Sequence, residues 1–405
     1  MRSGACHNSE VAIDADVLLQ SETLILIDTL AESDSSADIV QTVSALRRAG
    51  HPTERIHQAL EQLRLRRKGE AKFGPYASQM LFSETGLEQA SRLAVAAHHA
   101  GRFQAAGIRT VADLGCGIGG DSMAFAALGL SVLAVDSDHN TAALASYNLA
   151  MFDSVTVEHA DALQVDLSGV EGIWLDPARR EGGTRLVNPE QWSPSLTDAF
   201  TLARTRPSGI KLAPGMDREL IPADAEAQWV SHSGGVVEVV LWWGALARPG
   251  IRRSALVLGA EHSAELTAEN DAPDADIGPL RDYLYEPDGA VIRARLIGKL
   301  AGMLGGAMLS PGIAYITSDE EHHSVFAAGF AVHKVLPLKT KDLVAWVRDA
   351  NIGTLEIKKR GVDIDPARLR EQLSPQGSES GTLIITRYQG KKVAIVATRL
   401  VPAAG

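Results

Sequence analysis

Four aspartates of this 405-residue chain lie inside or directly after short apolar runs: Asp113, Asp136, Asp161 and Asp176. A carboxylate at the end of a strand can accept hydrogen bonds from both hydroxyls of a ribose. Carboxylates at the ends of neighbouring strands can pair with a ligand ammonium or accept a hydrogen bond from an adenine amine. The pattern therefore predicts a site for a polar, nucleoside-like ligand, provided that the fold brings the four carboxylates together.

The elements that would position these acids form a strand, a glycine turn, a helix and a second strand. The run Val111 to Leu114 ends in a cluster of glycines, a small-residue helical pattern follows, and the run Val132 to Val135 ends on Asp136. This order predicts one βαβ unit. Further strand-like runs lie at residues 155–159, 172–175, 210–213, 229–231, 236–243 and 255–258.

The glycine turn is suited to bind phosphate or a sulfonium nucleoside. Gly115, Gly117 and Gly120 fit the pattern G-x-G-x-x-G, which is weak evidence for a dinucleotide when it stands alone. Glycine tolerates a positive φ and lets a ligand approach the backbone, and the following helix presents free N–H groups. Asp113 before the turn and Asp161 farther along favour S-adenosylmethionine (SAM). A dehydrogenase and a nucleotide-fold sheet without ligand stay open as alternatives.

The series Asp113-x-Gly115-x-Gly117-x-Gly119, Asp136, Ala160-Asp161-Ala162 and Asp176-Pro177 resembles that of class I SAM-dependent methyltransferases. The resemblance implies an α/β fold with a Rossmann-like, seven-stranded sheet and SAM as the cofactor. It assigns these residues to the cofactor site: Phe82, Thr85, Asp113, Gly115, Gly117, Gly119, Asp121, Asp136, Ser137, Asp161, Ala162 and Asp176.

A segment upstream of the turn, Leu81 to Glu88, resembles an element of trimethylguanosine-synthase-like methyltransferases. There an aromatic residue before a capped helix lies against the cofactor, which gives Phe82 and Thr85 their assignment. Thr85 and Glu88 fit a capping box that starts a helix running through to His98. The alternative is a helix that only packs on the edge of the sheet.

The acceptor site is expected after the fourth strand. Amino methyltransferases carry Asp/Asn-Pro-Pro-aromatic there, and the acid binds an exocyclic amine while the aromatic stacks on the base. This chain has Asp176-Pro177-Ala178-Arg179, without the second proline and the aromatic. Arg179 could stack on a base or pair with phosphate, or close the loop by a salt bridge. We assign catalysis to Asp176, Pro177 and Arg179, take Trp192 as a stacking face, and expect Trp174 in the core. The basic loop at residues 182–185 could meet a polyanion.

Composition limits the classes of protein. The net charge is −11, but from Lys334 to the end there are 13 Lys/Arg and 7 Asp/Glu, so a basic module follows an acidic body. The two cysteines, Cys6 and Cys116, allow no disulfide framework or metal pattern. No run reaches the roughly 18 apolar residues of a membrane span, and the N-terminus has no apolar signal core. We expect a cytoplasmic protein with no metal and no membrane contact.

Four regions follow from these patterns: helices at 1–105, the methyltransferase domain at 106–262, and two C-terminal parts after a polar linker at 263–275. The C-terminal parts form an α+β module. The part at 276–333 resembles a ferredoxin-like module, and that at 334–405 a THUMP-like domain of a bacterial methyltransferase family, on the segment around Leu355 to Gly361 and the closing hairpin. THUMP domains recognise structured RNA, so RNA is the implied partner, through Lys358, Lys359 and Arg360.

The predicted function is therefore SAM-dependent methylation of a base amino group in structured RNA, either tRNA or rRNA. Two alternatives remain. The departure at Ala178 fits a protein that binds SAM and RNA without methyl transfer. A methyltransferase acting on a small molecule or a protein would make the basic C-terminus incidental.

Overall fold

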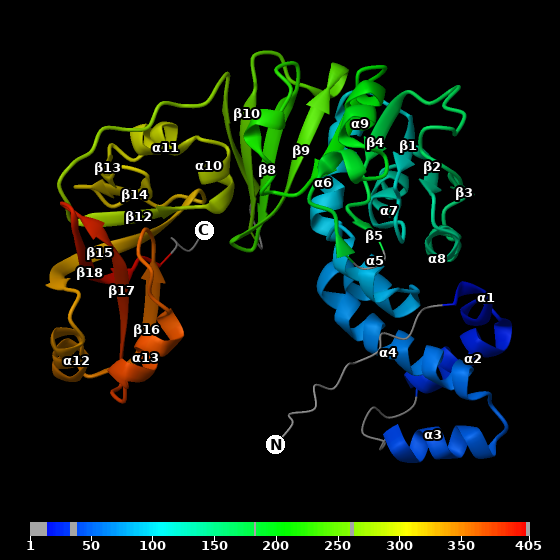
Figure 1. Cartoon of the computed structure of the whole chain (residues 1–405), viewed down its shortest axis with the longest axis horizontal. Helices are drawn as coiled ribbons and strands as arrows, with labels where there is room; N and C mark the ends of the chain where they lie inside the picture. Colours follow the sequence, from blue (N-terminus) through cyan, green and yellow to red (C-terminus); the bar gives the residue numbers. More distant parts are fainter. Residues whose placement is uncertain (1–13, 33–38, 182–183, 260–262, 402–405) are drawn as a thin grey trace. The chain divides into compact units, whose positions relative to one another are not determined.

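The computed structural model describes residues 14–32, 39–181, 184–259 and 263–401. The chain forms two compact units (Figure 1). The first comprises residues 1–211 and 242–247, and the second comprises residues 212–241 and 248–405. Cys6 and the glycines at 182 and 183 lie outside the described residues.

The first unit begins with helices, as the sequence predicts. The elements are α1 (Ala15–Leu18), α2 (Ser21–Glu32), α3 (Ile39–Arg48), α4 (Thr53–Phe73), the 3₁₀ helix η1 (Gly74–Gln79), α5 (Glu84–Gln89) and α6 (Leu93–Ala105). Pro52 precedes α4, where its fixed φ suits a helix start. The same helix buries Ile56, Leu65 and Phe73.

The predicted helix from Thr85 to His98 is wrong in its cap and its length. Ser83 is the N-cap of α5, and its hydroxyl accepts from the amide of Gly86 at 3.1 Å. The chain leaves helical geometry at Ala90, and α6 starts afresh at Leu93. A Cβ on Gly86 would lie 2.6 Å from Cγ2 of Ile118. This close approach to the glycine turn leaves no room for a side chain at position 86.

The sheet of the first unit is parallel. Its strands are β1 (Thr110–Leu114), β2 (Ser131–Asp136), β3 (Val155–His159), β4 (Gly172–Leu175) and β7 (Ser208–Leu212), in the order β7-β4-β1-β2-β3. The helices α7 (Gly120–Ala127), α8 (His139–Leu149) and α9 (Leu196–Ala203) lie between successive strands in the chain. Between β4 and α9 come the short pair β5 (Arg180–Glu181) and β6 (Thr184–Arg185) and the 3₁₀ helix η2 (Pro189–Gln191).

Four strands follow: β8 (Glu226–His232), β9 (Gly235–Trp243), β10 (Arg253–Leu258) and β11 (Ser263–Ala268), with the 3₁₀ helices η3 (Arg218–Leu220) and η4 (Gly244–Leu246). Ser233 and Gly234 join β8 to β9 with φ of 52° and 80°, and positive φ at both central residues is typical of a two-residue hairpin turn. The linker prediction is wrong for residues 263–268, because β11 pairs there with β10. Glu265 accepts from Arg248 Nη2 at 2.7 Å. The charged residue that made this segment resemble a linker is therefore paired with an arginine.

The C-terminal part of the second unit forms a seven-stranded sheet. Its elements are β12 (Tyr283–Pro287), α10 (Gly289–Arg293), α11 (Ile297–Met303), β13 (Ala307–Ser310), β14 (Ile313–Ser318), β15 (Ala327–Pro337), α12 (Thr340–Asp349), β16 (Ile352–Lys359), α13 (Pro366–Leu373), β17 (Glu379–Tyr388) and β18 (Lys391–Arg399). The order is β13-β14-β12-β15-β18-β17-β16. Strands from both predicted C-terminal regions thus share one sheet. Helices α10 and α11 are separated at Arg295, which has φ 59°.

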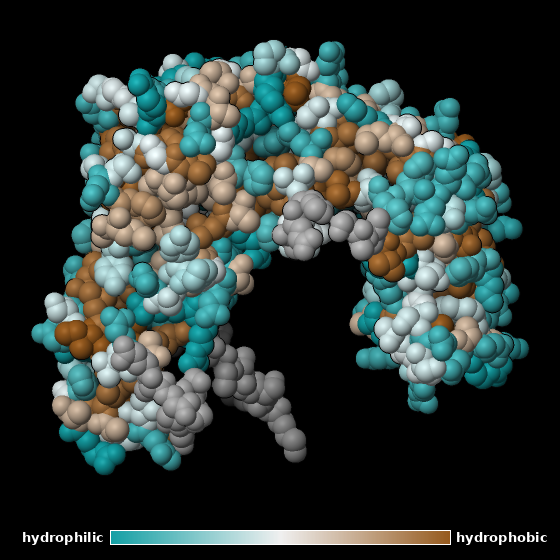
Figure 2. Space-filling model, turned by 180° about the vertical axis from the view of Figure 1, so that it is seen from behind, coloured by the Kyte–Doolittle hydropathy of each residue, from teal (hydrophilic) through white to brown (hydrophobic). Residues whose placement is uncertain are grey.

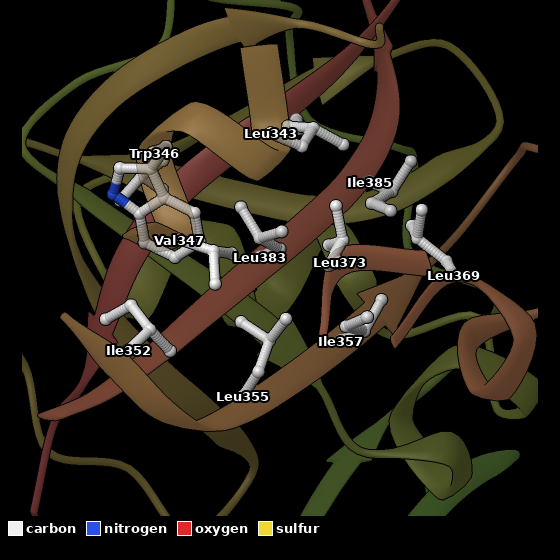
Figure 3. Packing of buried hydrophobic residues seen from close by; sticks show 12 residues of the cluster. Leu343, Trp346, Val347, Ile352, Leu355, Ile357, Leu369, Leu373, Leu383 and Ile385 are labelled. Atoms are coloured by element: carbon white, nitrogen blue, oxygen red, sulfur yellow. The ribbon is translucent and has the colours of Figure 1, made fainter. Parts of the chain in front are cut away.

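Alternate residues of this sheet fill two cores. On one face, Leu383 and Ile385 of β17 pack with Leu343, Trp346 and Leu369 of helices α12 and α13 (Figure 3). On the opposite face, Ile384, between those two residues, packs with Leu284, Tyr315 and Phe330. The period of two along a strand produces this division, and it gives the C-terminal module its own hydrophobic core.

Polar residues cover much of the surface drawn in Figure 2 and interrupt its hydrophobic patches. Within the described ranges, none of the helices has both the length and the apolar composition that a membrane crossing needs.

Candidate cofactor and acceptor site

Parallel pairing places the carboxyl ends of β1, β2, β3, β4 and β7 at one edge of the sheet. This edge therefore brings together the glycine turn after β1, Asp136 at the end of β2 and Asp176 directly after β4. Asp161 follows β3 by two residues, and Lys211 is the penultimate residue of β7. Open α/β sheets bind their ligands outside this edge, so the predicted residues meet where a ligand site is expected.

The three glycines of the turn are required for different reasons. Gly115 has φ 87°, and a Cβ there would lie 2.5 Å from the backbone oxygen of Asp176. Gly119 has φ 89°, and a Cβ there would lie 2.9 Å from Leu149. At Gly117, with φ 57°, a Cβ would meet nothing within 4 Å. The protein itself thus excludes side chains at Gly115 and Gly119, whereas Gly117 leaves room for a ligand beside the backbone.

The carboxylate of Asp136, predicted to bind a ribose, is oriented by two backbone amides. One carboxylate oxygen accepts from the amide of Gly117 at 3.0 Å and the other from the amide of Asp138 at 3.0 Å. Each oxygen of a carboxylate has two acceptor sites, so each retains one for a ribose hydroxyl. Burial raises the pKa of Asp136, and the two amide bonds oppose that rise. The open backbone at Gly117 and this acid together fit the nucleoside part of SAM.

The side chain of Asp113 is buried in the protein. It is 1% exposed, and one carboxylate oxygen accepts from the hydroxyl of Ser122 at 2.6 Å. Burial, and then the charge of Asp121, raise the pKa of Asp113 to about 8. The group is therefore protonated at neutral pH before a cation approaches, and its assignment to a ligand ammonium stays a prediction.

The remaining cofactor residues after β2 and β3 are accessible. Ser137 and Asp161 are exposed and Ala162 is half-buried. The carboxylate of Asp161 accepts from the amide of Leu163 at 2.8 Å, which fixes the turn and leaves acceptor capacity on both oxygens. This geometry is compatible with the predicted contact to an adenine amine.

The segment from Leu81 to Gly86 lies against the glycine turn. The side-chain amide of Asn148 donates to the carbonyls of Leu81 and Ile118, at 3.0 Å each, and its oxygen accepts from the amide of Leu81 at 2.8 Å. Phe82 is fully buried, with its ring centroid 5.6 Å from that of Phe73. Thr85 is exposed. Phe82 thus packs in the interior beneath this segment, and its contact with the cofactor stays a prediction.

Asp121, in the first turn of α7, is the centre of a buried polar network. Its carboxylate accepts from the hydroxyl of Ser91 at 2.7 Å and lies 2.8 Å from Nδ1 of His99. Burial raises the pKa of Asp121, but the hydrogen bond with His99 and the nearby charges outweigh it and hold the pKa at about 2. Asp121 is therefore an ionised carboxylate inside the protein rather than an open ligand contact.

The sequence analysis missed Lys211. Its ammonium nitrogen lies 2.5 Å from a carboxylate oxygen of Asp176, and its side chain is 7% exposed. A lysine inside the apolar run 210–213 is the signal that could have pointed to it, because a buried lysine requires a partner. Burial raises the pKa of Asp176, and the charge of Lys211 opposes that rise.

The other acceptor-side residues divide between core and surface. Pro177 is buried, Arg179 is half-buried and Trp192 is half-buried, with its indole donating to the carbonyl of Leu186 at 3.2 Å. Trp174 is fully buried, as expected, and its ring lies 4.3 Å from that of His99. Only Arg179 and Trp192 of this set leave a face that a base could contact.

No group of three or more His, Cys, Asp or Glu suited to a metal ion occurs among the residues that the structure describes. The buried thiol of Cys116 lies inside the glycine turn, and burial raises its pKa. In the C-terminal module, Lys358 and Arg360 pair with Glu286 at 2.7 Å and 3.3 Å, while Lys359 is exposed.

Comparisons with known proteins show which family the chain is similar to. Residues 327–399 match the family model of a THUMP domain-like region, and residues 16–69 match that of a domain of unknown function (DUF8688). An uncharacterized S-adenosylmethionine-dependent methyltransferase of Mycobacterium tuberculosis, in strains CDC 1551 and H37Rv, is 33% identical over 344 residues, which are 82% of this chain and 93% of the relative. A crystal structure of a candidate methyltransferase from Porphyromonas gingivalis W83 has a TM-score of 0.73 at 20% identity and covers 96% of this chain and 99% of that one. The last likeness shows the fold.

The glycine turn after the central strand and the acids along the carboxyl edge define the class I methyltransferase fold, with S-adenosylmethionine as the cofactor. The chain belongs to the family of S-adenosylmethionine-dependent methyltransferases that carry a C-terminal THUMP-like domain.

Proposed function

We propose that this methyltransferase acts on an amino group of a base in structured RNA, tRNA or rRNA. The observation that carries the proposal is the presence, in one chain, of an acid-proline pair after β4 and of a THUMP-like match at residues 327–399. The first feature concerns the atom that is methylated, and the second concerns the polymer that carries it.

In this proposal the glycine turn and three acids hold the cofactor. Gly117 offers its open backbone, Asp136 accepts from the ribose and Asp161 from the adenine amine. Asp113 pairs with the ammonium. SAM supplies a methyl group on a sulfonium, and positioning of the nucleophile at near-attack distance can provide most of the rate.

Asp176 binds the acceptor. A carboxylate oxygen accepts one N–H of the exocyclic amine, which orients the nitrogen lone pair towards the methyl carbon. As the N–C bond forms, the C–S bond breaks and its electron pair stays on sulfur. The nitrogen then gives up a proton, for which the carboxylate is the nearest acceptor. Pro177 fixes the backbone after the acid.

Stacking must come from a residue other than the missing aromatic. Arg179 and Trp192 are the half-buried planar groups next to the acceptor loop. A guanidinium plane can stack on a base as well as pair with phosphate. Stacking on an aromatic is worth about 1–3 kcal/mol per base, enough to replace a lost contact.

The test is transfer of labelled methyl to RNA from cells that lack the protein, followed by mass spectrometry of the nucleosides. The wild type should methylate one nucleoside that is unmodified in those cells. Asp176→Asn should bind SAM within about threefold of the wild type and lower turnover by about 100-fold or more. Asp153→Asn is the matched control, because Asp153 is exposed and precedes β3, at the opposite edge of the sheet.

Two other results would contradict the proposal. Tight SAM binding without label in any RNA would favour a protein that binds both and transfers nothing. Label that persists in protein or small molecules after ribonuclease treatment would favour a different acceptor.

A further inference from the structure

A buried ammonium is bound next to the acceptor acid. Lys211 of β7 and Asp176 after β4 come from neighbouring strands, with Ile210 opposite Leu175 in the register. The ammonium nitrogen lies 2.5 Å from one carboxylate oxygen, Oδ2, of Asp176. Since the Lys211 side chain is 7% exposed, water competes little for this contact.

The other donors of Lys211 are also used. Its ammonium donates to the hydroxyl of Ser91 at 3.1 Å and reaches the carbonyl of Gln89 at 3.5 Å. An ammonium has three N–H donors, so three acceptors fix its position as well as its charge. Lys211 therefore ties Asp176 to the segment 89–91, which follows α5.

Charged groups from four further elements face this lysine. Asp121 of α7 lies 3.9 Å from the ammonium, and His99 of α6 contacts Asp121. Asp113 of β1 and Lys72 of α4 act at longer range. The carboxylates of Asp176 and Asp121 thus lie 2.5 Å and 3.9 Å from this ammonium, which is the pairing that a buried lysine requires.

The pair has a consequence for the acceptor. Lys211 uses one of the two acceptor sites of Oδ2 of Asp176, so Oδ1 is the oxygen with more acceptor capacity left. A carboxylate already balanced by a cation gains little from binding a second cation but can still accept from a neutral N–H.

From this geometry we infer that Lys211 is a positioning residue of the methyl-transfer reaction. It orients the carboxylate of Asp176 so that Oδ1 accepts from a neutral exocyclic amine, and its ammonium balances the charge of that carboxylate. The inference rests on the proposed function, because it assumes that Asp176 binds the acceptor.

The test compares three variants of the full-length protein. Lys211→Met should lower kcat on the RNA substrate by about 100-fold while the Kd for SAM stays within about threefold. The acid limb of the pH–kcat profile should move to higher pH, because loss of the cation raises the pKa of Asp176. Lys211→Arg keeps the charge and should restore part of kcat and return the acid limb towards the wild-type position.

Lys72→Met is the matched control. Lys72 donates to the carbonyls of Leu87, Glu88 and Ala90 at 2.6–2.8 Å, so it stabilises the same segment without contacting Asp176. This variant should change SAM affinity and leave the acid limb in place. An acid limb that stays at the wild-type pH in Lys211→Met, or one that moves equally in Lys72→Met, would overturn the inference.

A measurement without RNA separates this inference from the proposed function. Lys211→Met leaves two buried carboxylates with one cation fewer, so it should unfold at lower denaturant concentration, and adding Asp176→Asn should recover part of the loss. Additive losses would overturn the inference. Recovery in this cycle, together with an absence of methyl transfer to RNA by the wild type, would overturn the proposed function and leave the ion pair in place.

Discussion

The backbone amide of Gly117 donates to the carboxylate of Asp136 at 3.0 Å. This bond links the glycine turn after β1 to the end of β2. The acid predicted to bind the ribose is therefore oriented by the turn that is predicted to admit the rest of the cofactor. Preorganisation of this kind lowers the ordering cost of binding, and it depends on a residue whose backbone has φ 57°.

Gly117→Ala should separate the cofactor role of this glycine from its conformational role. The new Cβ meets no protein atom within 4 Å. The free energy of unfolding should therefore fall by about 1–2 kcal/mol, which is the cost of a left-handed backbone conformation at an alanine. Affinity for SAM should fall about tenfold or more, measured by calorimetry. Gly129→Ala is the control, since Gly129 has φ 83° and equally open space but lies after α7, away from the site. Equal SAM affinities in the two variants would refute the cofactor role of Gly117.

Asp113 should release a proton when SAM binds. Its pKa of about 8 leaves it protonated at pH 7, and a ligand ammonium nearby would lower that pKa. Calorimetry at pH 7 in two buffers of different ionisation enthalpy should therefore give different binding enthalpies. Asp113→Asn retains an acceptor for Ser122 and should abolish the difference. If the wild type shows the same enthalpy in both buffers, Asp113 does not pair with the ammonium.

Local patterns were sufficient to predict most of the fold. The five parallel strands, the glycine turn and the hairpin at Gln389-Gly390, where φ is 49° and 74°, follow from apolar runs and residues that accept positive φ. The cap of α5 was mispredicted because the spacing of Thr85 and Glu88 fits a capping box, whereas the hydroxyl of Ser83 accepts from the amide of Gly86. Gly86 also lies close to Ile118, 32 positions away in the sequence, and no local pattern indicates that approach.

The residues of the candidate site could be predicted only where their position at the end of a single predicted strand identified them. Asp136 and Gly117 belong to one βαβ unit, so their spacing in the sequence was sufficient to predict that they lie close together. Lys211 and Ser91 are 120 residues apart, and no periodicity relates them. Strand β11 was missed for the same reason, because Glu265 resembles a linker residue until Arg248 is placed beside it.

Stability should depend on pH through Asp121. Its pKa in the folded state is about 2, below the ordinary 3.8, so the ionised carboxylate contributes stability that is fully present above about pH 4 and is lost as the pH falls towards 2. Asp121→Asn should cost about 2 kcal/mol at pH 7. Denaturant unfolding between pH 2 and 7 should show this cost shrinking at the acid end. Asp153→Asn, on an exposed residue, should show no such trend, and a cost that is constant with pH would contradict the assignment.

RNA binding, if it uses the C-terminal module, should depend on Lys359 more than on its neighbours. Lys358 and Arg360 are held by Glu286, whereas Lys359 is exposed on the same strand. Lys359→Ala should weaken binding of the RNA substrate and reduce the slope of log K against log salt by about 0.7–0.9, the value for one phosphate contact. Glu286→Gln should do the opposite, since it releases two cations, and should steepen the slope. Lys341→Ala, on exposed α12 surface, is the matched control for the loss of one charge. If Lys359→Ala and Lys341→Ala reduce the slope by the same amount, and Glu286→Gln increases it by that amount, the module contributes only its net charge. The strand then has no particular role in RNA binding.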